Sequence, residues 1–122
     1  MRFALISLLL LALTAAPRAE SIKILVQSSP LAGFQYYAGT ALWDEMKVGD
    51  KLTLIREPDN AHDANAVRVE WRGTQLGYLP RAENRSVAAE MDRGTTVAAR
   101  IARLTADRSP WRRLLIEVFV VL

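Results

Sequence analysis

The polar segment over residues 57–65 holds the side chains most capable of chemistry in this chain of 122 residues. His62 and Asp63 are adjacent there, and such a pair could form an acid–base dyad. Neighbouring residues of an extended backbone point in opposite directions, so only a loop could bring the two groups together. The chain has no cysteine and no serine in a sharp nucleophile turn. We therefore expect a protein that is not an enzyme.

The same segment is a poor metal site. One histidine beside Glu57, Asp59 and Asp63 lacks the spaced His and Cys ligands of zinc sites, and the run over 59–63 is not a calcium loop. We expect no metal and no cofactor. Asp63 and Asn65 could instead cap backbone amides of a turn. Asp63 could equally accept a hydrogen bond from a ligand hydroxyl.

Arg81 follows Pro80 at the start of a predicted helix over residues 81–92. A cation in the first turn opposes the helix dipole, which is unfavourable by a few tenths of a kcal/mol or more. Free amides at a helix start bind phosphate, and a forked guanidinium would add to such a site. The alternative is an arginine whose tip only reaches water.

Two adjacent tyrosines, Tyr36 and Tyr37, lie in a segment over residues 33–39 that we predict to be a short strand. In a strand one ring packs inward and the other faces solvent, where it could stack on a nucleic-acid base. Trp43, Trp71 and Trp111 could act in the same way. Packing in a core or a hairpin is nevertheless the more common role of tryptophan.

Alternating hydrophobicity predicts that strands dominate the remaining chain. The predicted strands, besides 33–39, cover residues 22–26, 51–56, 66–71, 74–79, 95–104 and 112–122. A helical turn is predicted over 41–46, a hairpin turn at Arg72-Gly73, and a helix end at Gly94. Tight connections favour a mainly β fold, a small OB-like β-barrel of about six strands with one or two short helices.

The first 19 residues are predicted to be a cleaved signal peptide, with the domain over residues 20–122. Arg2 precedes an apolar run over 3–13, and Ala16 and Ala19 offer small residues for cleavage. The run is shorter than the roughly 20 residues of a membrane-spanning helix. We expect a secreted or periplasmic protein without stable membrane insertion after cleavage; a retained anchor is the alternative.

Removal of that segment also takes away Arg2 and Arg18. Fourteen basic residues then face 13 acidic ones, and the net charge falls from +3 to about +1. A protein that holds long nucleic acid by charge needs a strongly basic stripe. The composition therefore leaves room only for a small site that holds an end or a short single strand.

Three motifs stand out in combination. They are the run Arg-Glu-Pro-Asp-Asn-x-x-Asp-x-Asn-Ala-Val-x-Val from Arg56 to Val69, Gly77-Tyr78-Leu79-Pro80, and the upstream Gly33-Phe34-Gln35-Tyr36-Tyr37-Ala38-Gly39. Together, over roughly residues 26–91, they resemble the HIRAN domain family. The resemblance implies a small OB-like β-barrel, found fused to fork-remodelling helicases and also as stand-alone bacterial proteins. It also implies binding of the 3′ end of single-stranded DNA.

Carried over by motif, the family's stacking tyrosine falls on Tyr36, its hydroxyl-binding aspartate on Asp63 and its phosphate-binding lysine on Arg81. Two positions depart: Gln35 stands where the family has an arginine, and His62 where it has a second aromatic ring. Loss of a cation and of a large ring should weaken DNA binding. The resemblance implies a nucleic-acid-binding set made of Gln35, Tyr36, Tyr37, His62, Asp63, Tyr78 and Arg81.

Two hypotheses follow. In the first, the chain is a non-enzymatic module that binds the 3′ end of single-stranded DNA by stacking, hydroxyl and phosphate contacts. In the second, it is an exported interaction module that has kept the barrel, lost DNA binding, and binds a protein or an envelope polymer. Gln35, His62, the near-neutral charge and the predicted export favour the second. The natural ligand, the cleavage site and the oligomeric state stay open.

Overall fold

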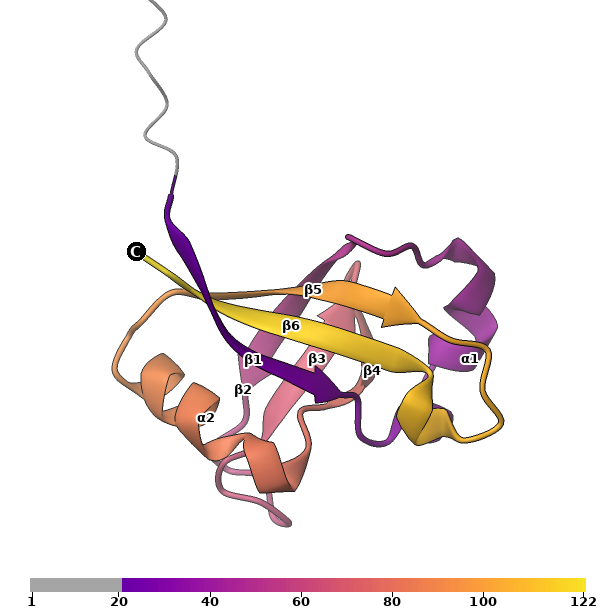
Figure 1. The fold of residues 1–122 in the computed structure, drawn as a ribbon. Helices are drawn as coiled ribbons and strands as arrows, with labels where there is room; N and C mark the ends of the chain where they lie inside the picture. Colours follow the sequence, from indigo (N-terminus) through magenta and orange to yellow (C-terminus); the bar gives the residue numbers. More distant parts are fainter. Residues whose placement is uncertain (1–20) are drawn as a thin grey trace, which may run out of the picture.

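The computed structural model describes residues 21–122, so the predicted signal peptide over 1–19 lies outside the described residues. Six antiparallel strands form one curled sheet in the order β1-β6-β5-β2-β3-β4 (Figure 1). The strands are β1 (Lys23–Pro30), β2 (Lys51–Arg56), β3 (Val67–Trp71), β4 (Thr74–Tyr78), β5 (Val97–Leu104) and β6 (Leu114–Val121). The prediction of a mainly β, OB-like fold is confirmed.

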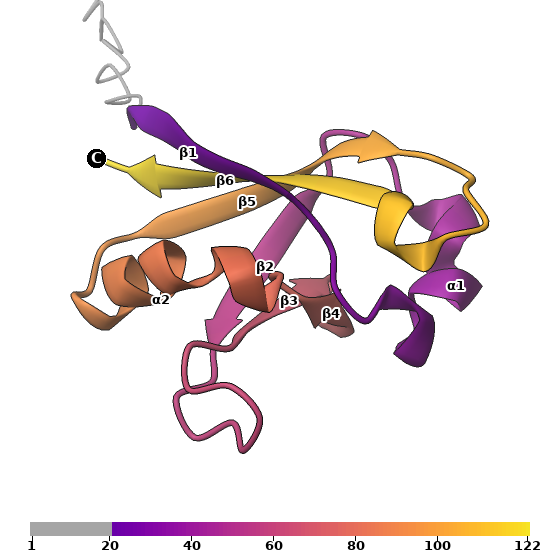
Figure 2. The same cartoon turned by 60° about the horizontal axis from the view of Figure 1, so that its bottom comes forward.

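Two short helices flank opposite ends of this sheet (Figures 1 and 2). They are α1 (Gly39–Leu42) and α2 (Arg85–Asp92), accompanied by the 3-10 turns η1 (Phe34–Tyr36), η2 (Trp43–Glu45), η3 (Arg81–Glu83) and η4 (Pro110–Arg112). The buried core draws on β2 to β6, α2 and the segment around η1. No helix within residues 21–122 is long and apolar enough to cross a membrane.

The hairpin prediction around Arg72-Gly73 is confirmed. Both residues have positive φ, 47° and 79°, as a two-residue type I′ turn between β3 and β4 requires. Strand β2 has the predicted bounds. Strand β1 is longer than predicted and runs to Pro30, because a bulge between Leu25 and Gln27 lets the strand bend and keep pairing with β6.

The predicted strand over residues 33–39 is wrong. Gly33 adopts a left-handed conformation with φ 77°, which turns the chain into η1 and then α1. The Phe34 ring is buried against Gly39, where a Cβ atom would collide with it. The segment therefore folds around one aromatic ring rather than extending along a neighbouring strand.

The predicted helix over residues 81–92 is split in two. Residues Arg81–Glu83 form the separate turn η3, and α2 begins only at Arg85. Asn84 lies between them with its side chain buried, and its carbonyl accepts the first α-helical hydrogen bond, from Ala88. The helix ends as predicted, since Gly94 has φ 81° and donates to the Met91 carbonyl.

The sheet does not close into a complete barrel. Its edge strands β1 and β4 approach each other at one isolated pair, in which Ala32 and Tyr78 exchange two backbone hydrogen bonds of 2.9 Å. Gly77 permits this approach because a Cβ atom there would collide with the Ala32 carbonyl oxygen. The segment after β1 can therefore lie against β4 only because residue 77 has no side chain.

We predict that Gly77→Ala lowers the free energy of unfolding by about 3 kcal/mol, through the collision and an unfavourable φ of 156°. Urea unfolding would measure the loss. Gly94→Ala is the matched control, because its φ is also positive but its Cβ would meet open space; we expect it to lose about 1–2 kcal/mol. Equal losses in the two variants would contradict the role assigned to the Ala32–Tyr78 pair.

Candidate nucleic-acid interface

The loop between β2 and β3 is held by its own side chains. The Asn60 carbonyl oxygen Oδ1 accepts hydrogen bonds from the backbone amides of His62 (2.9 Å) and Asp63 (3.2 Å). Asp63 Oδ1 accepts one from the amide of Asn65 (2.9 Å), which is the capping role that the sequence suggested for Asp63. The loop is therefore an ordered turn that presents His62 and Asp63 in a defined arrangement.

Glu57, at the start of this loop, joins it to two strands. Its Oε1 atom accepts hydrogen bonds from Asn60 Nδ2 (3.0 Å) and from the hydroxyl of Tyr78 on β4 (2.9 Å). Its Oε2 atom accepts one from Arg68 Nη1 on β3 (2.9 Å). One carboxylate thus orients both the Tyr78 ring and the Asn60 side chain that shapes the loop.

The environment of this carboxylate shifts two pKa values. Burial alone would raise the pKa of Glu57, but the hydrogen bonds from Asn60, Tyr78 and Arg68 outweigh it, and the net pKa is lowered. Burial and the hydrogen bond to Glu57 raise the pKa of Tyr78. Glu57 therefore stays ionised and Tyr78 stays protonated over the whole neutral range.

Two further contacts tie the loop to α2. Asp63 Oδ2 accepts a hydrogen bond of 2.7 Å from Nδ2 of the buried Asn84. Arg56 Nη1 donates to the Ala66 carbonyl (3.1 Å), while its Nε and Nη2 atoms bind both carboxylate oxygens of Asp92 (3.0 and 3.2 Å). Such a bidentate pair is geometrically specific. Contacts at both ends of α2 thus hold the loop in place.

A pocket of about 270 Å³ opens between this loop, β4 and the segment around η1. Five of the seven residues implied by the family resemblance line it: Tyr37, His62, Asp63, Tyr78 and Arg81. Ala32, Asn60, Ala66 and Leu79 complete the lining. We call this cavity the end pocket.

The two tyrosines at η1 have different positions. Tyr37 is half-buried, and its ring meets that of Tyr78 edge to face, with centroids 6.1 Å apart. Tyr36 is 79% exposed and lies with Tyr37 against Gly33, beside the end pocket rather than in its lining. One ring is thus packed and one is offered to solvent, as expected, although a 3-10 turn and not a strand separates them. Gln35 is exposed on the same turn and does not line the pocket.

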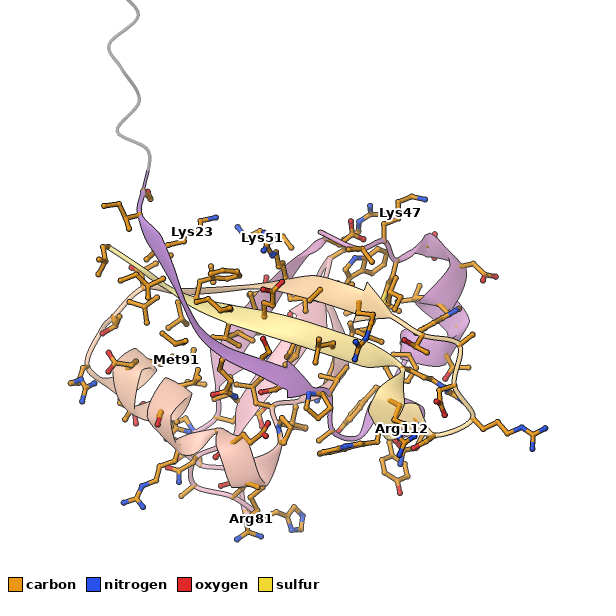
Figure 3. The ribbon with its side chains drawn as sticks, viewed as in Figure 1. Lys23, Lys47, Lys51, Arg81, Met91 and Arg112 are labelled. Carbon is orange, nitrogen blue, oxygen red and sulfur yellow. The ribbon has the colours of Figure 1, made fainter. Side chains whose placement is uncertain are left out.

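Arg81 is exposed, and no ion pair joins it to a carboxylate anywhere in residues 21–122. It belongs to η3, so the sequence argument that set it in the first turn of the α-helix is wrong. Figure 3 shows it at the lower end of the molecule, whereas the labelled lysines lie along the upper side. Its guanidinium is therefore free to bind an anion at the mouth of the end pocket.

The structure gives no support to a catalytic dyad or a metal site within the described residues. Both Asp63 oxygens bind Asn65 and Asn84, and none of the hydrogen bonds found in residues 21–122 links His62 to Asp63. No group of three or more His, Cys, Asp or Glu side chains in this range could hold a metal ion.

The three tryptophans divide between packing and exposure. Trp71 is buried and donates from Nε1 to Asp50 Oδ2 (3.0 Å). Trp43 is half-buried, with its ring edge to face with Phe34 at 5.9 Å. Trp111 is 49% exposed. The packing role therefore applies to the first two and not to the third.

Three residues that shape the site lie outside the predicted binding set. Asn60 carries a local signal, because the Asx side chains of the polar segment over 57–65 predict a turn, and the structure shows Asn60 in that role. Glu57 and Asn84 have partners on other elements, each 21 residues away in the chain at Tyr78 and Asp63 respectively. Local patterns carry no signal for such contacts.

We predict that Glu57→Gln lowers the free energy of unfolding by about 1–3 kcal/mol at pH 7, because hydrogen bonds to an ionised group are lost. A carboxylate whose pKa is lowered by folding stabilises the fold at pH values above 4.5, the usual pKa of a glutamate. This stabilisation is lost as the pH falls through the lowered pKa of the folded protein. The variant should therefore lose less stability than the wild type between about pH 5 and pH 3.

Urea unfolding across this range measures the effect, and Glu45→Gln is the control because Glu45 is exposed and has no hydrogen-bonded side-chain partner among the described residues. A Glu57→Gln variant with the acid dependence of the wild type would show that the Glu57 contacts do not stabilise the fold.

Comparison with known proteins agrees with this architecture. The HIRAN domain family model matches residues 24–122. A helicase-like transcription factor from Oryctolagus cuniculus is 32% identical over 81 residues, 66% of this chain and 8% of that protein. A putative SWI/SNF-related regulator of chromatin, subfamily A member 3-like 1, from Arabidopsis thaliana is 33% identical over 102 residues, 83% of this chain and 11% of that protein. A Fanconi-associated nuclease 1 homolog from Oryza sativa is 40% identical over 53 residues, 40% of this chain and 6% of that protein.

Two solved structures share the fold. A protein from Lactobacillus plantarum aligns with TM-score 0.71 at 24% identity, over 83% of this chain and 97% of that one. The HIRAN domain of human HLTF aligns with TM-score 0.59 at 20% identity, over 81% of this chain and 78% of that one. The chain spans at most 11% of the length of the three curated relatives. The family match over residues 24–122, on the fold that these structures share, identifies the chain as a member of the HIRAN domain family.

Proposed function

We propose that the domain is a non-enzymatic module that binds the 3′ end of single-stranded DNA. Membership of the HIRAN family supports a nucleic-acid-binding module in general terms. The observation that carries the finer proposal is the end pocket, which gathers an aromatic pair, a carboxylate and an unpaired guanidinium from separate elements. The relatives named as a nuclease and a helicase-like factor are matched over a small share of their length, so neither activity is proposed here.

Asp63 has the acceptor capacity that a terminal hydroxyl needs. An ionised carboxylate offers about four lone-pair directions. Two of them are used by Asn65 and Asn84, which hold the group in place. The remaining directions can accept a hydrogen bond from a 3′-hydroxyl, whereas a 3′-phosphate would bring a second negative charge against the carboxylate. The pocket would in this way select an unmodified strand end.

Tyr36 and Arg81 supply the two other contacts. Tyr36 is the most exposed aromatic ring in residues 21–122, and a solvated ring can stack on a base without any change in the fold. Arg81 can bind the phosphate of the terminal nucleotides with a forked pair of hydrogen bonds. Gln35 adds no charge and His62 offers a smaller ring, so we expect weaker binding than a member with arginine and a larger aromatic at these positions would show.

We predict that oligonucleotides with a free 3′-hydroxyl bind about tenfold or more tightly than those ending in a 3′-phosphate or a 3′-dideoxy sugar, because a hydrogen bond to a charged group is lost. Tyr36→Ala and Arg81→Ala should each weaken binding about 5- to 100-fold. Fluorescence anisotropy at about 0.1 M salt measures both effects.

Lys51→Ala is the matched control for Arg81→Ala, because it removes one exposed cation from the opposite side of the molecule (Figure 3). Equal affinity for all three strand ends, or no binding at millimolar protein, would rule out recognition of a 3′ end.

A second proposal keeps this surface but gives it a protein or an envelope polymer as partner, after export of the domain. The neutral Gln35 favours it, because η1 presents no cation beside the pocket. If this proposal holds, mass spectrometry of fractionated cells should find a form of the protein that begins at residue 20 in the periplasmic fraction. It also expects the partners captured from that fraction to be lost with a Tyr36→Ala, Arg81→Glu variant; cytoplasmic full-length protein would exclude it.

A further inference from the structure

We propose that a strand whose 3′ end occupies the end pocket continues in its 5′ direction past Tyr36 to a second subsite, formed by Trp111, Arg112 and Arg103. This inference rests on the proposed function and concerns residues outside the end pocket. It assigns to the second subsite one stacked base and the phosphates next to it.

Trp111 is the exposed tryptophan of the described chain. It projects from η4, the turn between β5 and β6, and is 49% exposed, whereas Trp71 is 4% exposed. The turn is ordered by backbone hydrogen bonds from Arg112 to Ser109 (3.0 Å) and from Arg113 to Pro110 (3.2 Å). A large ring held in solvent on a fixed turn loses little entropy when a base stacks on it.

The lining of the hollow beside Trp111 holds two cations and one carboxylate. Arg103, Arg112 and Asp107 line it together with Pro30, Thr105, Leu114 and Leu115. The segment over residues 103–113 contains four arginines, Arg103, Arg108, Arg112 and Arg113, and one carboxylate, Asp107. None of the four arginines forms an ion pair within residues 21–122.

That concentration of charge is large for this protein. Residues 21–122 carry 14 basic and 12 acidic side chains, an excess of two, whereas the segment over 103–113 alone has an excess of three. Oδ1 of the single carboxylate, Asp107, accepts a hydrogen bond from the backbone amide of Ser109 (2.8 Å). An exposed aromatic ring between unpaired arginines is the arrangement that binds single strands by stacking and by phosphate contacts.

This second subsite is joined to the end pocket through η1. Arg113 Nε donates to the Asp107 carbonyl (2.9 Å), and the guanidinium lies over the Phe34 ring, 5.8 Å from its centroid. Phe34 begins η1, which ends at Tyr36 and contacts both η4 and β4. Figures 1 and 2 show η4, in yellow, next to the η1–α1 segment.

The positions of Arg81 and Arg112 agree with this course of the strand. In Figure 3, Arg81 and Arg112 both lie on the lower side of the molecule, while the three labelled lysines lie on the upper side. A strand anchored at Arg81 and Asp63 by its 3′ end would leave the end pocket past η1 and reach η4, because η1 contacts both β4 and η4.

Calorimetric titration of the 21–122 domain with unlabelled oligothymidylates of about 2 to 16 nucleotides, each with a free 3′-hydroxyl, tests the second subsite. We expect affinity to rise by about fivefold or more once the strand is long enough to reach Trp111. Trp111→Ala and Arg112→Ala should each remove most of this gain with length and leave the affinity of the shortest strand unchanged. Lys51→Ala, which removes a cation of the opposite side, should keep the gain.

Strands with abasic sugars at the 5′ positions separate the two contacts, since they keep phosphates but have no bases to stack. We expect Trp111→Ala to leave the affinity for these abasic strands unchanged, and Arg112→Ala to lower it as it does for intact strands. The indole N–H signal of Trp111 in an NMR spectrum, assigned with Trp111→Tyr, should shift with long strands and not with the shortest. Trp111→Tyr should itself keep most of the gain, which shows that the ring and not the fold is responsible.

The outcomes distinguish this inference from the proposed function. If short strands bind but affinity does not grow with length, or if the gain survives in Trp111→Ala, the second subsite is excluded and the end pocket stands. If no strand binds at any length, both proposals fail.

Discussion

The Glu57 carboxylate is the contact on which the shape of the end pocket depends. It is ionised, partly buried and shared by three donors on three parts of the chain, Asn60, Arg68 and Tyr78. A charge in that position is stable only while its hydrogen bonds are made, because desolvation without partners is costly. The loop, β3 and β4 are therefore coupled: each keeps its place only if the others do. A rigid loop is what a small recognition site needs, since the entropy of ordering it is lost on folding rather than on binding.

The incomplete closure of the sheet explains why a pocket exists at this place. A closed barrel would pair β1 with β4 along their length, but here the edges meet only where Ala32 pairs with Tyr78. Beyond that pair the chain turns at Gly33 into η1 instead of continuing as a strand. The space left at this edge is bordered by η1 on one side and by the loop after β2 on the other, and the end pocket lies there. An open edge is thus covered by a turn and a loop rather than left exposed to other strands.

The distribution of charge is as informative as its amount. The excess of positive charge over residues 21–122 is small, which argues against tight binding to any polyanion by net charge alone. Local arrangement matters more, because salt screens charges that lie more than about 10 Å apart. Arg56, Arg68 and Arg100 are used in ion pairs within the fold, whereas Arg81 and Arg112 are not. Arg81 lines the end pocket and Arg112 lines the hollow beside Trp111, the two surfaces to which we assign ligand contacts.

The sequence by itself determined where the six strands of the sheet lie, the hairpin at Arg72-Gly73 and the helix end at Gly94, because periodicity and turn chemistry are local properties that a few neighbouring residues decide. It also indicated the family, through motifs read along the chain. Only the tertiary structure decided that Tyr36 is exposed on a turn, that Arg81 precedes the α-helix instead of opening it, and that Trp111 differs from the other tryptophans. Those outcomes depend on contacts between distant residues, such as Asp63 with Asn84 and Phe34 with Gly39, which compete with local preference and prevail through burial.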